Sequence, residues 1–215
     1  MNKLPAIMIA LGVALGLLIA ACAPIPTPPP PTPAPPTSPP PTPPGMTCES
    51  LDSLVPKTQI TVLAPPPGNS FQPPSMDLAA HPFTWGNGTM TPDGFAEVDD
   101  QGRAGGSGYD VEVNNVLLSV SIGAGQALQQ LQLTFGEYGG NLNLSVNNQL
   151  VNFNDFVNIA GTVIAGVKVD LLYISPSNDL GQILFQGPMM DQAAGLGQFS
   201  VGGQELWIDD ICFST

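Results

Sequence analysis

The sequence predicts an all-β fold, an antiparallel β-sandwich that follows a leader and a proline-rich segment. Residues 46–215, about 170 in number, have the usual size of one domain. They are rich in Gly, Asn, Val and Leu and poor in Lys, Glu and Ala, a composition that favours strands joined by tight turns. Their apolar residues recur at every second position in a series of short runs, and no helical period is present. Eight or more such runs are typical of a β-sandwich or a barrel.

Residues 1–21 have the features of a lipoprotein signal peptide. Lys3 supplies a positive charge, residues 4–18 form an apolar core, and Ile19-Ala20-Ala21 precede Cys22. This ending resembles the lipobox of bacterial lipoproteins, and the resemblance implies that Cys22 carries diacylglycerol. A plain signal peptide and an N-terminal membrane helix are the alternatives, although a spanning helix needs roughly 20 apolar residues and this run is shorter. We therefore expect a lipid-anchored protein of the bacterial cell envelope, on the outer membrane or facing outward from the cell membrane.

Residues 22–45 contain the candidate lipidated cysteine and a segment built almost wholly of Pro, Thr, Ser and Ala. Proline fixes φ and removes a hydrogen-bond donor, so the segment favours an extended polyproline helix of about 3.1 Å per residue. Its reach is then on the order of 60 Å, which suits a stalk. A proline-rich ligand for a recognition domain is the alternative.

In chain order we expect strands at residues 57–63, 109–113, 116–122, 131–135, 142–146, 149–153, 162–174, 182–186, 198–201 and 205–213. Asn147-Asn148 separates two of these runs and predicts a two-residue hairpin turn, because asparagine tolerates φ > 0. The acidic stretch of Asp93, Glu97, Asp99 and Asp100 lacks the spacing of an EF-hand loop, and we interpret it as a solvated turn.

The domain is strongly acidic. Without Lys3 the chain keeps Lys57, Arg103 and Lys168 against seventeen carboxylates, a formal charge of 3 − 17 = −14. So few cations cannot neutralise a row of phosphates, which argues against nucleic acid and anionic lipid headgroups as partners.

Two further cysteines lie near the two ends of the domain. In an oxidising compartment Cys48 and Cys212 are expected to form a disulfide, which requires Cα atoms within about 7 Å and therefore places the first strand beside the last. Two free buried thiols are the alternative.

The last predicted strand carries the motif Ile208-Asp209-Asp210-Ile211. This motif, together with chain ends that meet, resembles the jelly-roll modules of the galactose-binding and carbohydrate-binding kind. The resemblance implies a jelly-roll-like sandwich and a structural Ca²⁺ near the last strand, with Asp209 and Asp210 as candidate ligands. Strict alternation predicts Leu206, Ile208, Asp210 and Cys212 on one face and Trp207, Asp209 and Ile211 on the other. Hydrogen bonds from loop amides to the inward carboxylate are the alternative to calcium.

The sequence favours a non-catalytic binding module, with glycans as candidate ligands. Sugar rings stack on exposed aromatic side chains, and the candidates are Trp85, Tyr109, Tyr138 and Trp207, each of which also suits a core position. A structural or adhesive envelope component with protein partners is the first alternative. The second is a glycosidase that uses a carboxylate pair, with Glu112, Glu137 and Glu205 as candidates. The only histidine, His81, has no nucleophile near it in the sequence and cannot complete a zinc site.

Overall fold

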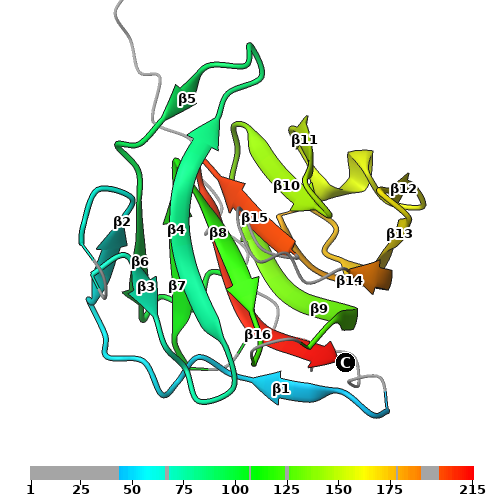
Figure 1. Ribbon diagram of the computed structural model, residues 1–215, viewed down its shortest axis with the longest axis horizontal. Helices are drawn as coiled ribbons and strands as arrows, with labels where there is room; N and C mark the ends of the chain where they lie inside the picture. The colour runs from blue at the N-terminus through cyan, green and yellow to red at the C-terminus, as the bar shows by residue number, and fades with distance from the viewer. Residues whose placement is uncertain (1–43, 66–67, 107, 124–125, 178, 190–198) are drawn as a thin grey trace, which may run out of the picture. The chain divides into compact units, whose positions relative to one another are not determined.

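The computed structural model describes residues 44–65, 68–106, 108–123, 126–177, 179–189 and 199–215. The predicted leader, Cys22 and nearly all of the proline-rich segment lie outside these residues. The described residues form two antiparallel sheets packed as a β-sandwich, which confirms the predicted fold class (Figure 1). They include one short 3-10 turn, η1 (Phe156–Asn158), and no helix with the length and apolar character needed to span a membrane.

The strands divide between a nine-stranded sheet, called sheet A, and a seven-stranded sheet, called sheet B. Sheet A has the order β12 (Val163–Ile164), β13 (Val167–Ile174), β14 (Leu180–Met189), β9 (Leu128–Glu137), β16 (Leu206–Ser214), β7 (Asp110–Asn114), β6 (Phe95–Asp99) and β2 (Gln59–Thr61), with β1 (Thr47–Glu49) also paired to β16. Sheet B has the order β11 (Gln149–Phe153), β10 (Leu142–Val146), β15 (Phe199–Gly203), β8 (Val116–Ser121), β4 (Asp77–Thr84) and β3 (Ser70–Phe71), with β5 (Met90–Thr91) paired to β4.

The pairing is nested in the way that the jelly-roll resemblance implies. Strand β7 pairs with β16 in sheet A, β8 with β15 in sheet B, and β9 with β14 in sheet A again. Early strands thus pair with late ones, and successive pairs alternate between the sheets. The last strand consequently lies in the interior of sheet A, next to both β7 and β9 (Figure 1).

The core lies between the sheets and follows from the period of two. Alternate residues of β9 and β8, such as Leu133 and Leu118, are fully buried in one apolar cluster. Phe185 of sheet A and Phe199 of sheet B meet with ring centroids 4.7 Å apart. Burying such aromatic rings contributes strongly to stability, because each removes a large apolar area from water.

The structure confirms one predicted turn and corrects one predicted strand. Asn147 and Asn148 have φ of 48° and 64° and join β10 to β11, which confirms the predicted hairpin. The single strand expected over residues 162–174 was wrong, because Ala165 and Gly166 turn with φ of 48° and 83° and divide it into β12 and β13.

The predictions missed five strands, of which β4 and β6 are the longest. Strand β4 contains Pro82, which normally argues against a strand. Here Ala80 donates its N–H to Asn69 O on the β3 side, so Pro82, two residues on, faces the same side beyond the end of β3. Its missing N–H therefore costs no ladder hydrogen bond.

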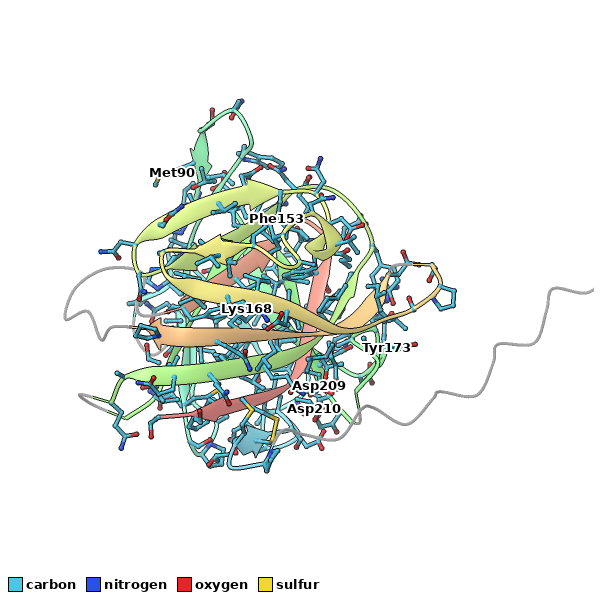
Figure 2. The ribbon with its side chains drawn as sticks, turned by 90° about the vertical axis from the view of Figure 1, so that its right-hand side faces the viewer. Met90, Phe153, Lys168, Tyr173, Asp209 and Asp210 are labelled. Atoms are coloured by element: carbon cyan, nitrogen blue, oxygen red, sulfur yellow. A yellow bond between two sulfur atoms is a disulfide. The ribbon has the colours of Figure 1, made fainter. Side chains whose placement is uncertain are left out.

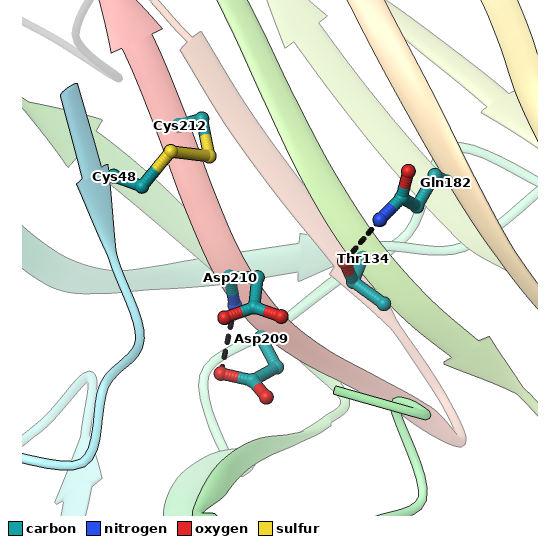
Figure 3. The surroundings of a disulfide bond; sticks show 6 residues. All are labelled: Cys48, Thr134, Gln182, Asp209, Asp210 and Cys212. Carbon is teal, nitrogen blue, oxygen red and sulfur yellow. Dashed lines mark hydrogen bonds between the residues drawn. A yellow bond between two sulfur atoms is a disulfide. The ribbon is translucent and has the colours of Figure 1, made fainter. Parts of the chain in front are cut away.

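The predicted disulfide is present. Cys48 lies directly opposite Cys212 in the β1–β16 pair, with Cα atoms 4.0 Å apart (Figure 3). The bridge holds β1 against the last strand beside the pair Asp209 and Asp210.

Candidate functional site

A row of buried polar residues crosses the outer face of sheet A. Asp99 of β6 lies opposite Asp110 of β7, and Asp209 of β16 lies opposite Thr134 of β9. These four residues are nearly inaccessible to water. Buried carboxylates are costly unless hydrogen bonds, opposite charges or protonation offset them, so each has to be explained.

The β6–β7 loop (residues 100–109, with Ser107 not described) covers this row. The backbone of sheet A accommodates the loop only because Gly136 has no side chain, since a Cβ there would collide with the carbonyl oxygen of Arg103. Likewise, a Cβ at Gly106 would collide with the carboxylate of Asp209. The glycines at these two contacts therefore allow the loop to lie directly on the sheet.

The predicted face assignment of the last strand was wrong beyond Asp209. The register of β16 against β9 shifts between Asp209 and Cys212, and Asp210 has a φ of 46°. This β-bulge inserts one residue, so Ile211 joins Leu206 and Ile208 in the core, although strict alternation placed it on the opposite face.

The bulge brings the carboxylate of Asp209 against the backbone N–H of Asp210 and close to the Asp210 carboxylate. The backbone N–H of Asp210 donates to Asp209 Oδ1 at 2.7 Å (Figure 3). Burial, together with the charge of Asp210, raises the pKa of Asp209 to about 8. Burial and the charge of Asp52 also raise the pKa of Asp210. Asp209 therefore carries a proton through much of the neutral pH range.

Asp110 completes this acidic cluster. Its Oδ2 accepts a hydrogen bond from the Ala104 N–H at 2.9 Å, whereas its Oδ1 is buried and has no hydrogen-bond partner among the described residues. Burial raises the pKa of Asp110. Carboxylate oxygens are the ligands that Ca²⁺ prefers, yet no three His, Cys, Asp or Glu side chains within the described residues are arranged to hold one metal ion.

An aromatic cluster lies beside the row. The rings of Tyr138 and Trp207 meet edge to face, 5.2 Å between centroids, and the guanidinium of Arg103 lies 4.7 Å from the centroid of Trp207 and 5.7 Å from that of Tyr138. Tyr138 is 41% exposed, whereas Trp207 is 4% exposed. Such cation–π contacts hold the arginine over the indole face. Only Tyr138 of this pair offers its ring to a ligand.

Asp99 links the cluster to Lys57. Lys57 Nζ lies 2.8 Å from Asp99 Oδ1, and Trp207 Nε1 donates to Asp99 Oδ2 at 3.3 Å. Burial alone would raise the pKa of Asp99, but the hydrogen bonds from Lys57, the backbone of Asp100 and Trp207 outweigh it and lower that pKa. The interpretation of the acidic stretch as a solvated turn was therefore wrong for Glu97 and Asp99, which both lie in β6, Asp99 as a buried residue at its end.

The two other aromatic candidates lie apart from these ring contacts. Trp85 packs edge-on against Phe83, with centroids 5.3 Å apart, and is half-buried. It follows Thr84, whose backbone N–H and C=O both bond to the side chain of the buried Asn143. Tyr109 is half-buried and packs against the core, and its backbone N–H donates to Asp52 Oδ1 at 2.8 Å.

Glu137, one of the glutamates proposed for catalysis, has a strongly raised pKa. Burial and a hydrogen bond between its carboxyl group and that of Asp155 raise its pKa to about 8. Its two oxygens also accept from the Phe156 N–H, at 3.4 and 3.2 Å, at the start of η1. Glu137 is therefore best explained as a protonated group that caps η1.

His81 has a partner that the sequence did not reveal. Its Nε2 lies 2.9 Å from Ser119 Oγ, because Ser119 of β8 is the neighbour of Ala79 in β4. The Ser119 hydroxyl also donates to Ala79 O at 3.3 Å. Burial lowers the pKa of His81, which favours the neutral ring.

Comparison with known proteins adds no assignment. No protein-family model matches the chain, and neither the curated proteins nor the solved structures contain a match to it. The candidate site therefore rests on the residues themselves: an exposed Tyr138 on a buried Trp207, an arginine over both rings, and a buried acidic row beneath the same loop.

Proposed function

We propose that the chain is a bacterial envelope lipoprotein that displays a non-catalytic β-sandwich for binding glycans. The residues around Cys22 support a lipid anchor, and two acyl chains would make that anchor lasting. The proline-rich segment would hold the domain on the order of 60 Å from the membrane. Replacing Cys22 with Ala should release the protein from the membrane fraction, and an unchanged membrane association would contradict the anchor.

The observation that carries the glycan proposal is the exposed ring of Tyr138. Its edge contact with Trp207 and the hydrogen bond from its hydroxyl to Arg103 O, 3.0 Å long, fix its orientation. A sugar ring gains most from an aromatic side chain that is already held in place, because little conformational entropy is then lost on binding. Tyr138 meets this condition on the outer face of the domain.

A glycan array with the full chain in detergent micelles tests the proposal, with and without calcium. We expect glycan binding that is lost in Tyr138→Ala. Tyr173→Ala is the matched control, because Tyr173 is 38% exposed on β13 and lies outside the cluster (Figure 2). An array without hits, or equal loss in both variants, would contradict a glycan site at Tyr138.

One observation favours the alternative of a structural or adhesive envelope component. The edge strand β12 and the two residues before it pair with β13 only as far as Val169, whereas β13 continues to Ile174 with Leu172 and Tyr173 exposed. Unpaired strand edges with apolar side chains can accept a strand from a partner protein. Crosslinking in intact cells should then capture a protein partner through β13, and loss of the crosslink in Leu172→Asp would identify the edge.

Structural calcium is part of the proposal as a stabilising ion held by Asp209 and Asp210, with Asp110 and Asp52 nearby. Its support is the buried Oδ1 of Asp110, which no described residue hydrogen-bonds, and the preference of Ca²⁺ for carboxylate oxygens. Added calcium should raise the melting temperature of the parent and have no effect on Asp209→Asn. An equal melting temperature of the parent in calcium and in EDTA would remove calcium from the proposal.

A further inference from the structure

Arg103 differs from the two other cations of the domain in its pairing. Lys57 forms ion pairs with Glu97, Asp99 and Asp100, and Lys168 pairs with Asp170 at 2.7 Å. Arg103 forms none with any described carboxylate, although the domain carries seventeen acidic residues. Its Nε donates to Gln101 Oε1 at 3.0 Å, and its two Nη groups hydrogen-bond to no described residue.

Several contacts fix the position of this unpaired guanidinium. The carbonyl oxygen of Arg103 accepts from the Tyr138 hydroxyl and approaches the backbone at Gly136, where a side chain would collide with it. The guanidinium lies over Trp207, and Gln101 binds its Nε. The side chain nevertheless remains exposed at the surface. An arginine held in this way loses less conformational entropy when it binds an anion than a free one does.

We propose that Arg103 binds the carboxylate of an acidic sugar residue whose ring stacks on Tyr138. This inference rests on the proposed glycan-binding function and specifies the ligand class. The planar guanidinium presents paired donors that match a carboxylate, and charge-assisted bonds of this kind are about twice as strong as neutral ones. The exposed ring of Tyr138 lies 5.7 Å from the guanidinium carbon, so one sugar residue can reach both groups.

The charge of the domain narrows the ligand class further. With a formal charge of −14, the domain repels a densely charged polymer, whereas a local contact with one carboxylate is affected much less. The carboxyl groups of Asp110 and Asp179 lie close enough to Tyr138 to interact with it electrostatically, and their negative charge adds to this repulsion. The ligand class is therefore a largely neutral glycan with isolated uronic acid residues.

The test compares glucuronate with glucose, which differ only in a carboxylate in place of a hydroxymethyl group. The probe is the tryptophan emission of the full chain in detergent with Trp85→Phe, so that only Trp207, beneath Arg103, reports binding. We expect glucuronate to bind about tenfold more tightly than glucose. Arg103→Gln should abolish this preference, and Arg103→Lys should retain part of it. Lys168→Gln removes the same charge elsewhere and should change nothing.

Different results would contradict the role of Arg103 and the proposed glycan-binding function. Equal affinities for glucuronate and glucose that depend on Tyr138 would overturn the inference and leave the glycan proposal standing. Equal losses in Arg103→Gln and Lys168→Gln would also overturn it, because the effect would then be one of net charge. If neither sugar binds and the array is empty as well, the proposed function itself fails. A comparison of the two sugars on the Trp85→Phe protein needs no change at Arg103, so it holds even if Arg103→Gln unfolds.

Discussion

Replacing Asp209 with Asn should make the stability of the domain less sensitive to pH. In the folded protein, burial and the charge of Asp210 raise the pKa of Asp209 from 3.8 to about 8. Between those values the folded state holds a proton that the unfolded state has released. The stability of the parent therefore falls as the pH rises through this range and levels off above about 8. Asparagine keeps the acceptor for the Asp210 N–H and does not titrate.

The expected size of the effect follows from the same pKa difference. Each unit corresponds to about 1.4 kcal/mol, so a shift of roughly four units amounts to about 6 kcal/mol, an upper value because neighbouring groups and local relaxation share it. The free energy of unfolding of Asp209→Asn should match that of the parent near pH 4 and exceed it by several kcal/mol at pH 9.

Urea denaturation at pH 4, 6, 8 and 9 measures this difference, in EDTA so that no cation binds the carboxylates. Asp77→Asn removes an exposed carboxylate on β4 and serves as the control. The reasoning is refuted if the stability difference between Asp209→Asn and the parent is the same at all four pH values, or if the variant is the less stable protein at pH 9.

Three further changes test the fold and the site. Cys48→Ala with Cys212→Ala should lower the free energy of unfolding by at most about 5 kcal/mol, because the bridge closes a loop of 164 residues, and an unchanged denaturation midpoint would contradict this. Asn143→Ala removes the two hydrogen bonds that Asn143 makes to the Thr84 backbone and leaves the one from Asn152 to Thr84 O, so a loss of about 2 kcal/mol and a shift in Trp85 emission are expected, and an unaltered spectrum would argue against the contact. Gly136→Ala should displace Arg103 from Trp207, visible in the Trp207 emission of a Trp85→Phe background, whereas Lys168→Gln, outside the cluster, should preserve that stacking.

Much of the sandwich was predictable because a residue on one face of a strand repeats at every second position. Residues 142–153 show this clearly, since apolar alternation and the pair Asn147-Asn148 predict both strands and the turn between them. Strand β4 was not predicted, because a His-Pro dipeptide argues against a strand unless the neighbouring strand is known to end there. The sequence does contain a signal for the bulge in β16, because the apolar residues Ile208 and Ile211 are three positions apart. Two core residues at an odd spacing in one strand require an extra residue between them.

The candidate site was predictable only in part. Tyr138, Trp207, Asp209 and Asp210 could be chosen from residue type, but nothing in the sequence places the β6–β7 loop across sheet A. The sequence therefore does not identify Arg103 as a site residue. The glycines around it, Gly102, Gly105 and Gly106, do indicate a loop that can approach a backbone closely. The burial of Asp99 and the contact of Ser119 with His81 likewise depend on strands distant in sequence.

The most direct test of the glycan proposal is the dissociation constant of the full chain for its best ligand on the array, measured for the parent and for Tyr138→Ala. We expect the variant to bind at least about tenfold more weakly with an unchanged melting temperature, in keeping with the 1–3 kcal/mol that a stacked aromatic side chain contributes at a binding site. Equal dissociation constants for the two proteins would contradict the proposal that Tyr138 is the platform on which the sugar is bound.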